Sequence, residues 1–177
     1  MRVLIVKTSS MGDVVHALPA LSDLLAHVPE AQVDWMVEPP FAPIVELHPG
    51  VRRVLPLAWR RWRKSLWRAA TRAELRSFRR QLREQPYDLV LDLQGLIKSA
   101  AWAAQARGPR AGYDRHSIWE PLAALSYQRV ARVGKQLHAI ERCRRLVAAH
   151  LGYALPSTPP DFGLRVPSAG WRAQAPR

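Results

Sequence analysis

The chain opens with MRVLIVKTSSMGDV, residues 1–14, and this stretch decides the fold. The apolar run at 3–6 is short and uninterrupted, as in a buried strand, and residues 8–13 then turn the chain into a segment of helical period. In that segment apolar side chains recur every three or four residues, at Val14, Leu18, Leu21 and Leu25. A strand, a turn and an amphipathic helix in this order predict the first unit of a parallel α/β sheet.

The same alternation of short apolar runs and helical segments continues to residue 152. Strands are predicted at 33–37, 51–57, 87–93 and 110–113. Helices are predicted at 69–84 and 97–106, from Pro121 onward, and between Gly134 and Gly152. In this last helix the apolar spacing leaves three arginines mostly facing outward, namely Arg142, Arg144 and Arg145.

A chain of 177 residues built in this way fits one domain better than two. After Tyr153, prolines are spaced through a segment that shows neither a strand nor a helix period. We therefore predict a domain at 1–155 and a linker with an irregular tail at 156–177.

The charge of the chain is strongly positive and is concentrated in one segment. The 27 Lys and Arg residues outnumber the 14 Asp and Glu residues, which implies a partner rich in negative charge. No acidic residue falls between Glu46 and Glu74, yet that segment holds Arg52, Arg53, Arg60, Arg61, Arg63, Lys64, Arg68 and Arg72. Net charge alone does not choose among nucleic acid, anionic lipid headgroups and acidic glycans.

The turn after the first strand is the first candidate site. Ligands of open α/β sheets bind at the carboxyl ends of the strands, where Ser9, Ser10, Gly12 and Asp13 follow the run at 3–6. Asp13 either caps the helix that follows or acts on a ligand as a carboxylate, and both interpretations stay open. Four further side chains could reach the same crevice, namely His16, Gln94, Lys98 and Ser99. His16 is also explained as a structural side chain, and Lys98 as a solvated charge on a helix.

The second candidate site is the basic block at 60–64, which is flanked and interrupted by tryptophans. Guanidinium groups match carboxylate and phosphate oxygens, and indole rings can stack on sugar faces or lie in a lipid interface. The four cationic members of the block are Arg60, Arg61, Arg63 and Lys64. A solvated basic surface and a nucleic-acid site remain alternatives at this point.

Several functional classes lack their motifs in this sequence. The six histidines and the single Cys143 form no metal-binding pattern, so we expect no metal. No nucleophile-elbow or P-loop motif occurs, and every long apolar stretch is interrupted by charge. A lone cysteine is compatible with a reducing compartment.

Five segments, in order along the chain, resemble the lipopolysaccharide heptosyltransferases of type I, in glycosyltransferase family 9. They are 1–14, 60–64, 94–100, 120–123 and 135–142, and the resemblance runs to about Gly163. It implies a Rossmann-like parallel sheet flanked by helices, the N-terminal, acceptor-binding half of a two-domain GT-B glycosyltransferase. It further implies transfer of heptose from ADP-heptose to the Kdo region of Kdo2-lipid A, with inversion and without a cofactor or metal.

Carried over, the resemblance implies that Asp13 is the general base and that Arg60, Arg61, Arg63 and Lys64 bind the acceptor. It implies a peripheral protein on the cytoplasmic face of the bacterial inner membrane, with an anionic membrane surface and no nucleic acid as partner.

The sequence departs from the family pattern in two places. Trp119 stands where the family often has arginine, and Arg115 could replace that acceptor contact. The second, donor-binding domain is not found in the chain, so we expect negligible activity from this chain alone. The alternative interpretations are a non-catalytic module that binds anionic glycolipid and an enzyme like heptosyltransferase II.

Overall fold

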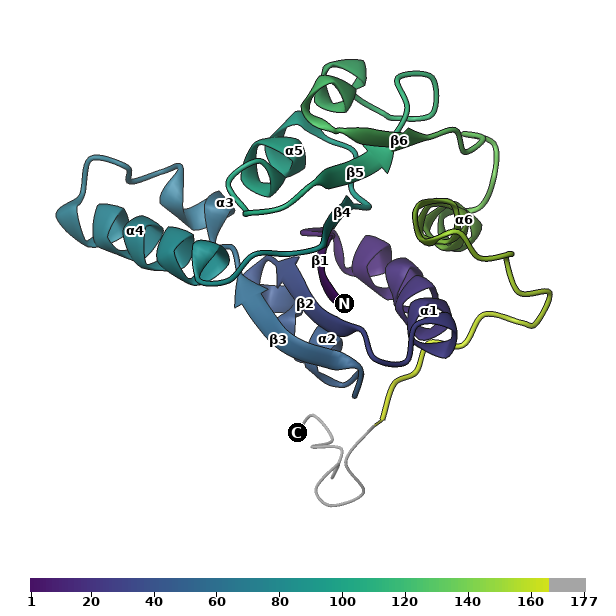
Figure 1. Cartoon of the computed structure of the whole chain (residues 1–177). Coiled ribbons are helices and arrows are strands. Elements are labelled where there is room, and N and C mark those ends of the chain that lie inside the picture. Colours follow the sequence, from purple (N-terminus) through teal and green to yellow (C-terminus); the bar gives the residue numbers. More distant parts are fainter. Residues whose placement is uncertain (166–177) are drawn as a thin grey trace, which may run out of the picture.

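The computed structural model describes residues 1–165, which form one sheet with helices on both faces (Figure 1). The sheet has six strands, all parallel, in the order β3-β2-β1-β4-β5-β6. This is the Rossmann order, in which the chain builds one half of the sheet outward from β1 and then returns to build the other half. The strands are β1 (Arg2–Val6), β2 (Gln32–Val37), β3 (Val51–Pro56), β4 (Leu89–Asp92), β5 (Arg110–Tyr113) and β6 (Arg129–Ala131). The predicted Rossmann-like α/β fold is confirmed.

The helices agree with the sequence pattern where they are long. They are α1 (Met11–His27), α2 (Ala42–Glu46), α3 (Trp59–Trp62), α4 (Ala69–Arg83), α5 (Ile97–Ala103) and α6 (Ala139–Leu151), with 3₁₀ turns η1 (Pro39–Phe41) and η2 (Pro121–Ser126). The helix predicted from Pro121 is thus a 3₁₀ turn. The sequence pattern missed α2, α3 and β6, because elements of three to five residues are too short to show a period.

The side chains of β1 alternate between two cores, one on each face of the sheet. Val3 and Ile5 pack into the core beneath α1 and α6, and Leu4 and Val6 pack into the core beneath α3, α4 and α5. All four side chains are fully buried. A central parallel strand is covered on both faces, which explains why residues 3–6 are all apolar.

Two arginines of α6 are buried, which corrects the prediction that they face outward. Arg142 and Arg144 are each only 4% exposed. Arg144 forms an ion pair with Asp23 of α1, with 2.6 Å between Nε and Oδ2. The apolar period marks only part of the buried face of α6, because a carboxylate on a neighbouring helix lets an arginine be buried as well. Arg145 does lie at the surface, where it pairs with Glu141.

Helix α6 ends at Gly152, whose φ of 77° is the left-handed conformation that glycine adopts readily. The segment after it lies against the domain: Arg144 donates to the carbonyl oxygen of Thr158, and the N–H of Arg165 donates to Leu47. Most of the predicted tail, residues 166–177, lies outside the described residues, and the boundary at 155 stays a prediction. Within residues 1–165, no helix is both long and apolar enough to cross a membrane.

Candidate active site

The loop after β1 is held by a side chain that follows β4. Gln94 is buried, and its Oε1 accepts hydrogen bonds from the N–H groups of Thr8 and Ser9, at 3.1 and 3.3 Å. Strands β1 and β4 are neighbours, so their carboxyl ends meet at one edge of the sheet. The sequence named Gln94 as a residue that could line this crevice, and in the structure its side chain holds the loop after β1.

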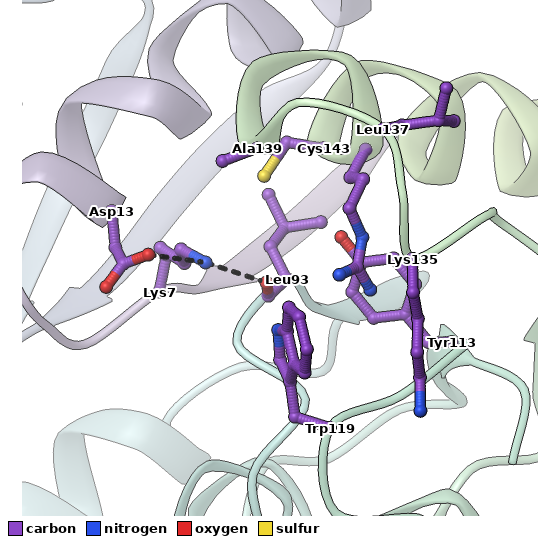
Figure 2. A pocket seen from close by; sticks show the side chains of 10 residues that line it. Lys7, Asp13, Leu93, Tyr113, Trp119, Lys135, Leu137, Ala139 and Cys143 are labelled. Carbon is purple, nitrogen blue, oxygen red and sulfur yellow. Dashed lines mark hydrogen bonds and ion pairs between the residues drawn. The ribbon is translucent and has the colours of Figure 1, made fainter. Parts of the chain in front are cut away.

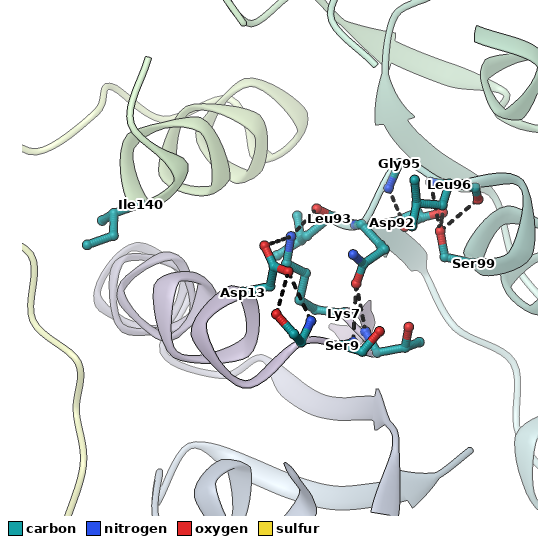
Figure 3. Close-up of polar contacts among 12 residues, drawn as sticks. Lys7, Ser9, Asp13, Asp92, Leu93, Gly95, Leu96, Ser99 and Ile140 are labelled. Carbon is teal, nitrogen blue, oxygen red and sulfur yellow. Dashed lines mark hydrogen bonds and ion pairs between the residues drawn. The ribbon is translucent and has the colours of Figure 1, made fainter. Parts of the chain in front are cut away.

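A buried carboxylate fixes the turn that carries Gln94. Asp92 accepts hydrogen bonds from the N–H groups of Gln94 and Gly95 and from the hydroxyl of Ser99 (Figure 3). The hydroxyl of Tyr127 also donates to it, at 2.7 Å. Burial raises the pKa of Asp92, and these four hydrogen bonds oppose the rise. The network is structural and sets the geometry of the loop edge.

Asp13 uses its two carboxylate oxygens differently. Oδ2 accepts from the N–H and the hydroxyl of Ser10, at 2.9 and 3.2 Å, which caps α1. Oδ1 lies 3.8 Å from Nζ of Lys7, and the side chain of Asp13 is 42% exposed. Lys7 itself is buried and donates to the carbonyl oxygen of Leu93 (Figures 2 and 3). Capping therefore leaves one oxygen of Asp13 available for chemistry, so the two interpretations of this residue are compatible.

The side chains of Asp13 and Lys7 line a cleft of about 240 Å³ beside the carboxyl ends of β1 and β4. Its walls come from α1, from the ends of β4 and β5 and from the start of α6 (Figure 2). The other lining residues are Leu93, Tyr113, Trp119, Lys135, Leu137, Ala139, Arg142 and Cys143. Three cations and one carboxylate give this cleft a positive balance.

The remaining loop residues lie at the same edge. Nζ of Lys98 lies 3.5 Å from the hydroxyl of Ser9, which brings the start of α5 to the loop. A side chain placed on Gly12 would meet no other atom within 4 Å, so packing inside the domain does not require glycine there. Open space beside Gly12 is what a close ligand approach needs.

The basic block divides into separate groups in the structure. All four cations of the block are exposed, and Arg61 also pairs with Glu74 of α4, with 3.1 Å between Nη1 and Oε1. Trp62 is buried in the core and donates to the same Glu74. Its indole therefore cannot stack on a ligand, whereas Trp67, which follows the block, is 70% exposed.

Glu38, at the end of β2, is a site residue that the sequence analysis missed. Its carboxylate is buried and accepts from the N–H of Arg60 at 3.1 Å, and its own N–H donates to the carbonyl oxygen of Thr8. Burial raises the pKa of Glu38, and the charges of Arg60, Lys98 and Arg63 oppose the rise. An acidic residue directly after a predicted strand was the available signal. Glu38 joins the basic block to the loop after β1.

Replacing Glu38 by glutamine is expected to change how stability depends on pH. A carboxyl whose pKa is raised in the folded state makes the protein less stable as the pH rises from the pKa of the unfolded state through that of the folded state. Glutamine does not ionise, and its oxygen can still accept from Arg60. The free energy of unfolding of Glu38→Gln, relative to the original chain, should therefore increase between about pH 4 and pH 7. Urea unfolding across this range measures it, with the exposed Glu30→Gln as control; a difference that stays constant or decreases would contradict the assignment.

Arg115 does not line the cleft, so it does not replace there the arginine that the family often has at position 119. It is exposed, donates to His116, and lines a separate pocket with Leu125 and Val130. The guanidinium next to Trp119 belongs to Arg142, at 4.8 Å from the ring centre.

Within residues 1–165, no three His, Cys, Asp or Glu side chains come together in a way that could hold a metal ion. The metal-free mechanism, like the roles assigned to the individual site residues, stays a prediction.

Comparisons with known proteins identify the family. The protein-family model described as glycosyltransferase family 9 (heptosyltransferase) matches residues 75–175 of this chain. Lipopolysaccharide heptosyltransferase 1 of Pseudomonas aeruginosa is 52% identical over 166 residues, which are 93% of this chain and 46% of that protein. Its counterpart in Escherichia coli K12 is 50% identical over 165 residues, which are 93% of this chain and 52% of that protein. The chain thus spans about half the length of the curated relatives it matches.

A solved structure agrees with these sequence matches. E. coli heptosyltransferase WaaC with ADP matches this fold with a TM-score of 0.90 at 50% identity, over 92% of this chain and 51% of that chain. The family match covers more than half of this chain, and the sheet has the same Rossmann-like architecture. The chain belongs to glycosyltransferase family 9, the heptosyltransferases.

Proposed function

We propose that this chain provides the acceptor-binding part and the general base of a type I lipopolysaccharide heptosyltransferase. The reaction would transfer heptose from ADP-heptose to the Kdo region of Kdo2-lipid A, without a metal or another cofactor. The observation that carries the proposal is the Asp13 carboxylate, which keeps Oδ1 on a cationic cleft at the carboxyl edge of the sheet. The 50% identity to a heptosyltransferase solved with ADP supports it.

In this proposal Asp13 accepts the proton of the attacking Kdo hydroxyl. The acceptor oxygen bonds to the anomeric carbon of heptose while the bond from that carbon to the diphosphate breaks, and ADP leaves. Because the hydroxyl becomes acidic as its oxygen forms this bond, a carboxylate suffices as the base. The hydrogen bonds from Ser10 to Oδ2 hold the carboxylate in place, and Nζ of Lys7 lies beside Oδ1 at 3.8 Å.

The exposed cations near the same edge fit an anionic acceptor. The charges of Arg60, Lys98 and Arg63 each oppose the rise in the pKa of Glu38, and Lys64, which follows Arg63 in the sequence, is exposed. We assign these side chains to Kdo carboxylates and lipid A phosphates, with Arg61 held partly by Glu74. This acceptor would place the protein on the cytoplasmic face of the inner membrane, as a peripheral protein at an anionic lipid surface.

Removing two cations of the block tests the acceptor assignment on the 177-residue chain. The variant Arg63→Ala/Lys64→Ala is expected to bind Kdo2-lipid A micelles about tenfold more weakly, because two exposed ionic contacts are lost. Isothermal titration calorimetry measures the affinity. The control, Arg76→Ala/Arg80→Ala, removes two exposed arginines of α4 and should bind as the original chain does. Equal losses in both variants would show only a general charge effect and would contradict the assignment.

A further inference from the structure

The cleft that Asp13 lines is also lined by an arginine with unused hydrogen-bonding capacity. Arg142 is 4% exposed, and its guanidinium lies between two aromatic rings, 4.9 Å from the centre of Tyr113 and 4.8 Å from that of Trp119. Its Nη2 donates to the carbonyl oxygen of Ser117 at 2.6 Å. Its Nε is buried without a partner among residues 1–165, and Nη1 donates no hydrogen bond there.

Arg144, two residues further along α6, has the counterion that Arg142 lacks among residues 1–165. Arg144 is equally buried, but its guanidinium is neutralised by Asp23. In the described part of the chain, no carboxylate forms an ion pair with Arg142. A buried charge without a counterion is costly, so a position of this kind indicates that a negative group is supplied from outside the domain.

Two lysines lie in the same cleft. Nζ of Lys135 lies 5.9 Å from the centre of the Trp119 ring, and Lys7 lies beside Asp13. Figure 2 shows Asp13 and Lys7 on one side of the cleft and Trp119 and Lys135 on the other. Trp119 is 61% exposed, so its ring forms an open apolar wall rather than part of the core.

We propose that this cleft is a binding site for an oxyanion. Arg142 and Lys135 bind the anion, and the rings of Trp119 and Tyr113 form the walls of the site. The proposal rests on the proposed function and adds a second anion-binding site to it, separate from the basic block at 60–64. A guanidinium presents paired donors that match a carboxylate or a phosphate group, and the aromatic walls exclude water from the contact. A bound oxyanion here would lie beside Asp13 and would orient the molecule that carries it toward the base.

Two sources could supply this anion, the carboxylate of the acceptor sugar or the diphosphate of the donor. The binding experiment distinguishes them by titrating the 177-residue chain separately with free Kdo, with Kdo methyl ester and with ADP. The methyl ester keeps the sugar and removes its negative charge. Calorimetry gives the affinities, and the Trp119 indole N–H signal in ¹H–¹⁵N NMR spectra reports whether the ligand occupies this cleft.

The variants are Lys135→Glu and Arg142→Met. Lys135 is exposed, so its replacement should not affect folding, and methionine keeps the apolar stem of the buried Arg142. Each is expected to weaken binding of the anion at least about tenfold, because a charged hydrogen-bond donor is lost. The matched controls are Arg132→Glu, an exposed cation three residues before Lys135, and Arg145→Ala, an exposed arginine of α6.

Binding of Kdo, with the ester at least about tenfold weaker, supports the site with the acceptor carboxylate as its ligand. Binding of ADP instead, lost in both variants, supports the site with the donor diphosphate as its ligand. Equal affinity for Kdo and its ester would overturn the proposal, as would binding that Lys135→Glu leaves unchanged or no binding up to roughly 20 mM. These failures would leave the proposed function standing, because the Arg63 and Lys64 variants test acceptor binding independently.

Discussion

Replacing Asp13 by asparagine is expected to lower the rate of heptose transfer by about a thousandfold, because the reaction would lose its general base. The enzyme for this measurement is a chimera in which this chain replaces the matching segment of E. coli heptosyltransferase 1, to which it is 50% identical. Asparagine can still accept the hydrogen bonds of Ser10 through its amide oxygen, so the cap of α1 should persist. The affinity for Kdo2-lipid A should therefore change little while kcat falls.

A second carboxylate provides the control for this substitution. Asp161 also accepts a backbone N–H, that of Gly163 at 2.9 Å, but it does not line the cleft. Asp161→Asn should retain the full transfer rate. If the Asp13→Asn chimera keeps more than about a tenth of the original kcat, Asp13 is not the general base and serves only as a helix cap.

The largest effect on stability is expected from Arg144→Ala, which should lower the free energy of unfolding by about 3 to 5 kcal/mol. The substitution leaves Asp23 as a buried carboxylate without its partner. Arg144 also donates to the carbonyl oxygens of Pro156 and Thr158, so the segment after α6 would lose contacts as well. Urea unfolding followed by circular dichroism measures the change.

The neighbouring Arg145→Ala provides the matched comparison. Arg145 is exposed and pairs with Glu141 one turn away, a surface contact that contributes about 0.3 to 0.5 kcal/mol. A cost for Arg144→Ala no larger than that for Arg145→Ala would show that the buried pair does not connect α1 to α6. The double variant Asp23→Ala/Arg144→Ala should cost less than the sum of the two single variants, because neither charge is then left alone.

The sequence predicted those parts of the fold that depend on local pattern. Residues 3–6 are apolar because β1 is covered on both faces, and the spacing from Val14 to Leu25 places one face of α1 on the core. Both signals lie within a few residues of the element they describe. The last predicted helix likewise ends where α6 does, at Gly152.

The parts that the sequence did not predict depend on contacts between distant residues. Arg144 is buried because of Asp23, 121 residues earlier in the chain. Gln94 clamps the loop at Thr8, which lies 86 residues away, and only the pairing of β1 with β4 brings the two together. The role of Arg142 depends in the same way on rings from β5 and from the segment that precedes η2. No local period encodes such partners.

Product formation by the chimera tests most directly whether this chain supplies a working acceptor site and base to a heptosyltransferase. The chimera with E. coli heptosyltransferase 1 is incubated with ADP-heptose and Kdo2-lipid A, and the mass of the lipid product is measured by mass spectrometry. We expect the mass of the lipid to increase by one heptose residue. A folded chimera that binds Kdo2-lipid A but adds no heptose would contradict the claim and would favour a module that only binds anionic glycolipid.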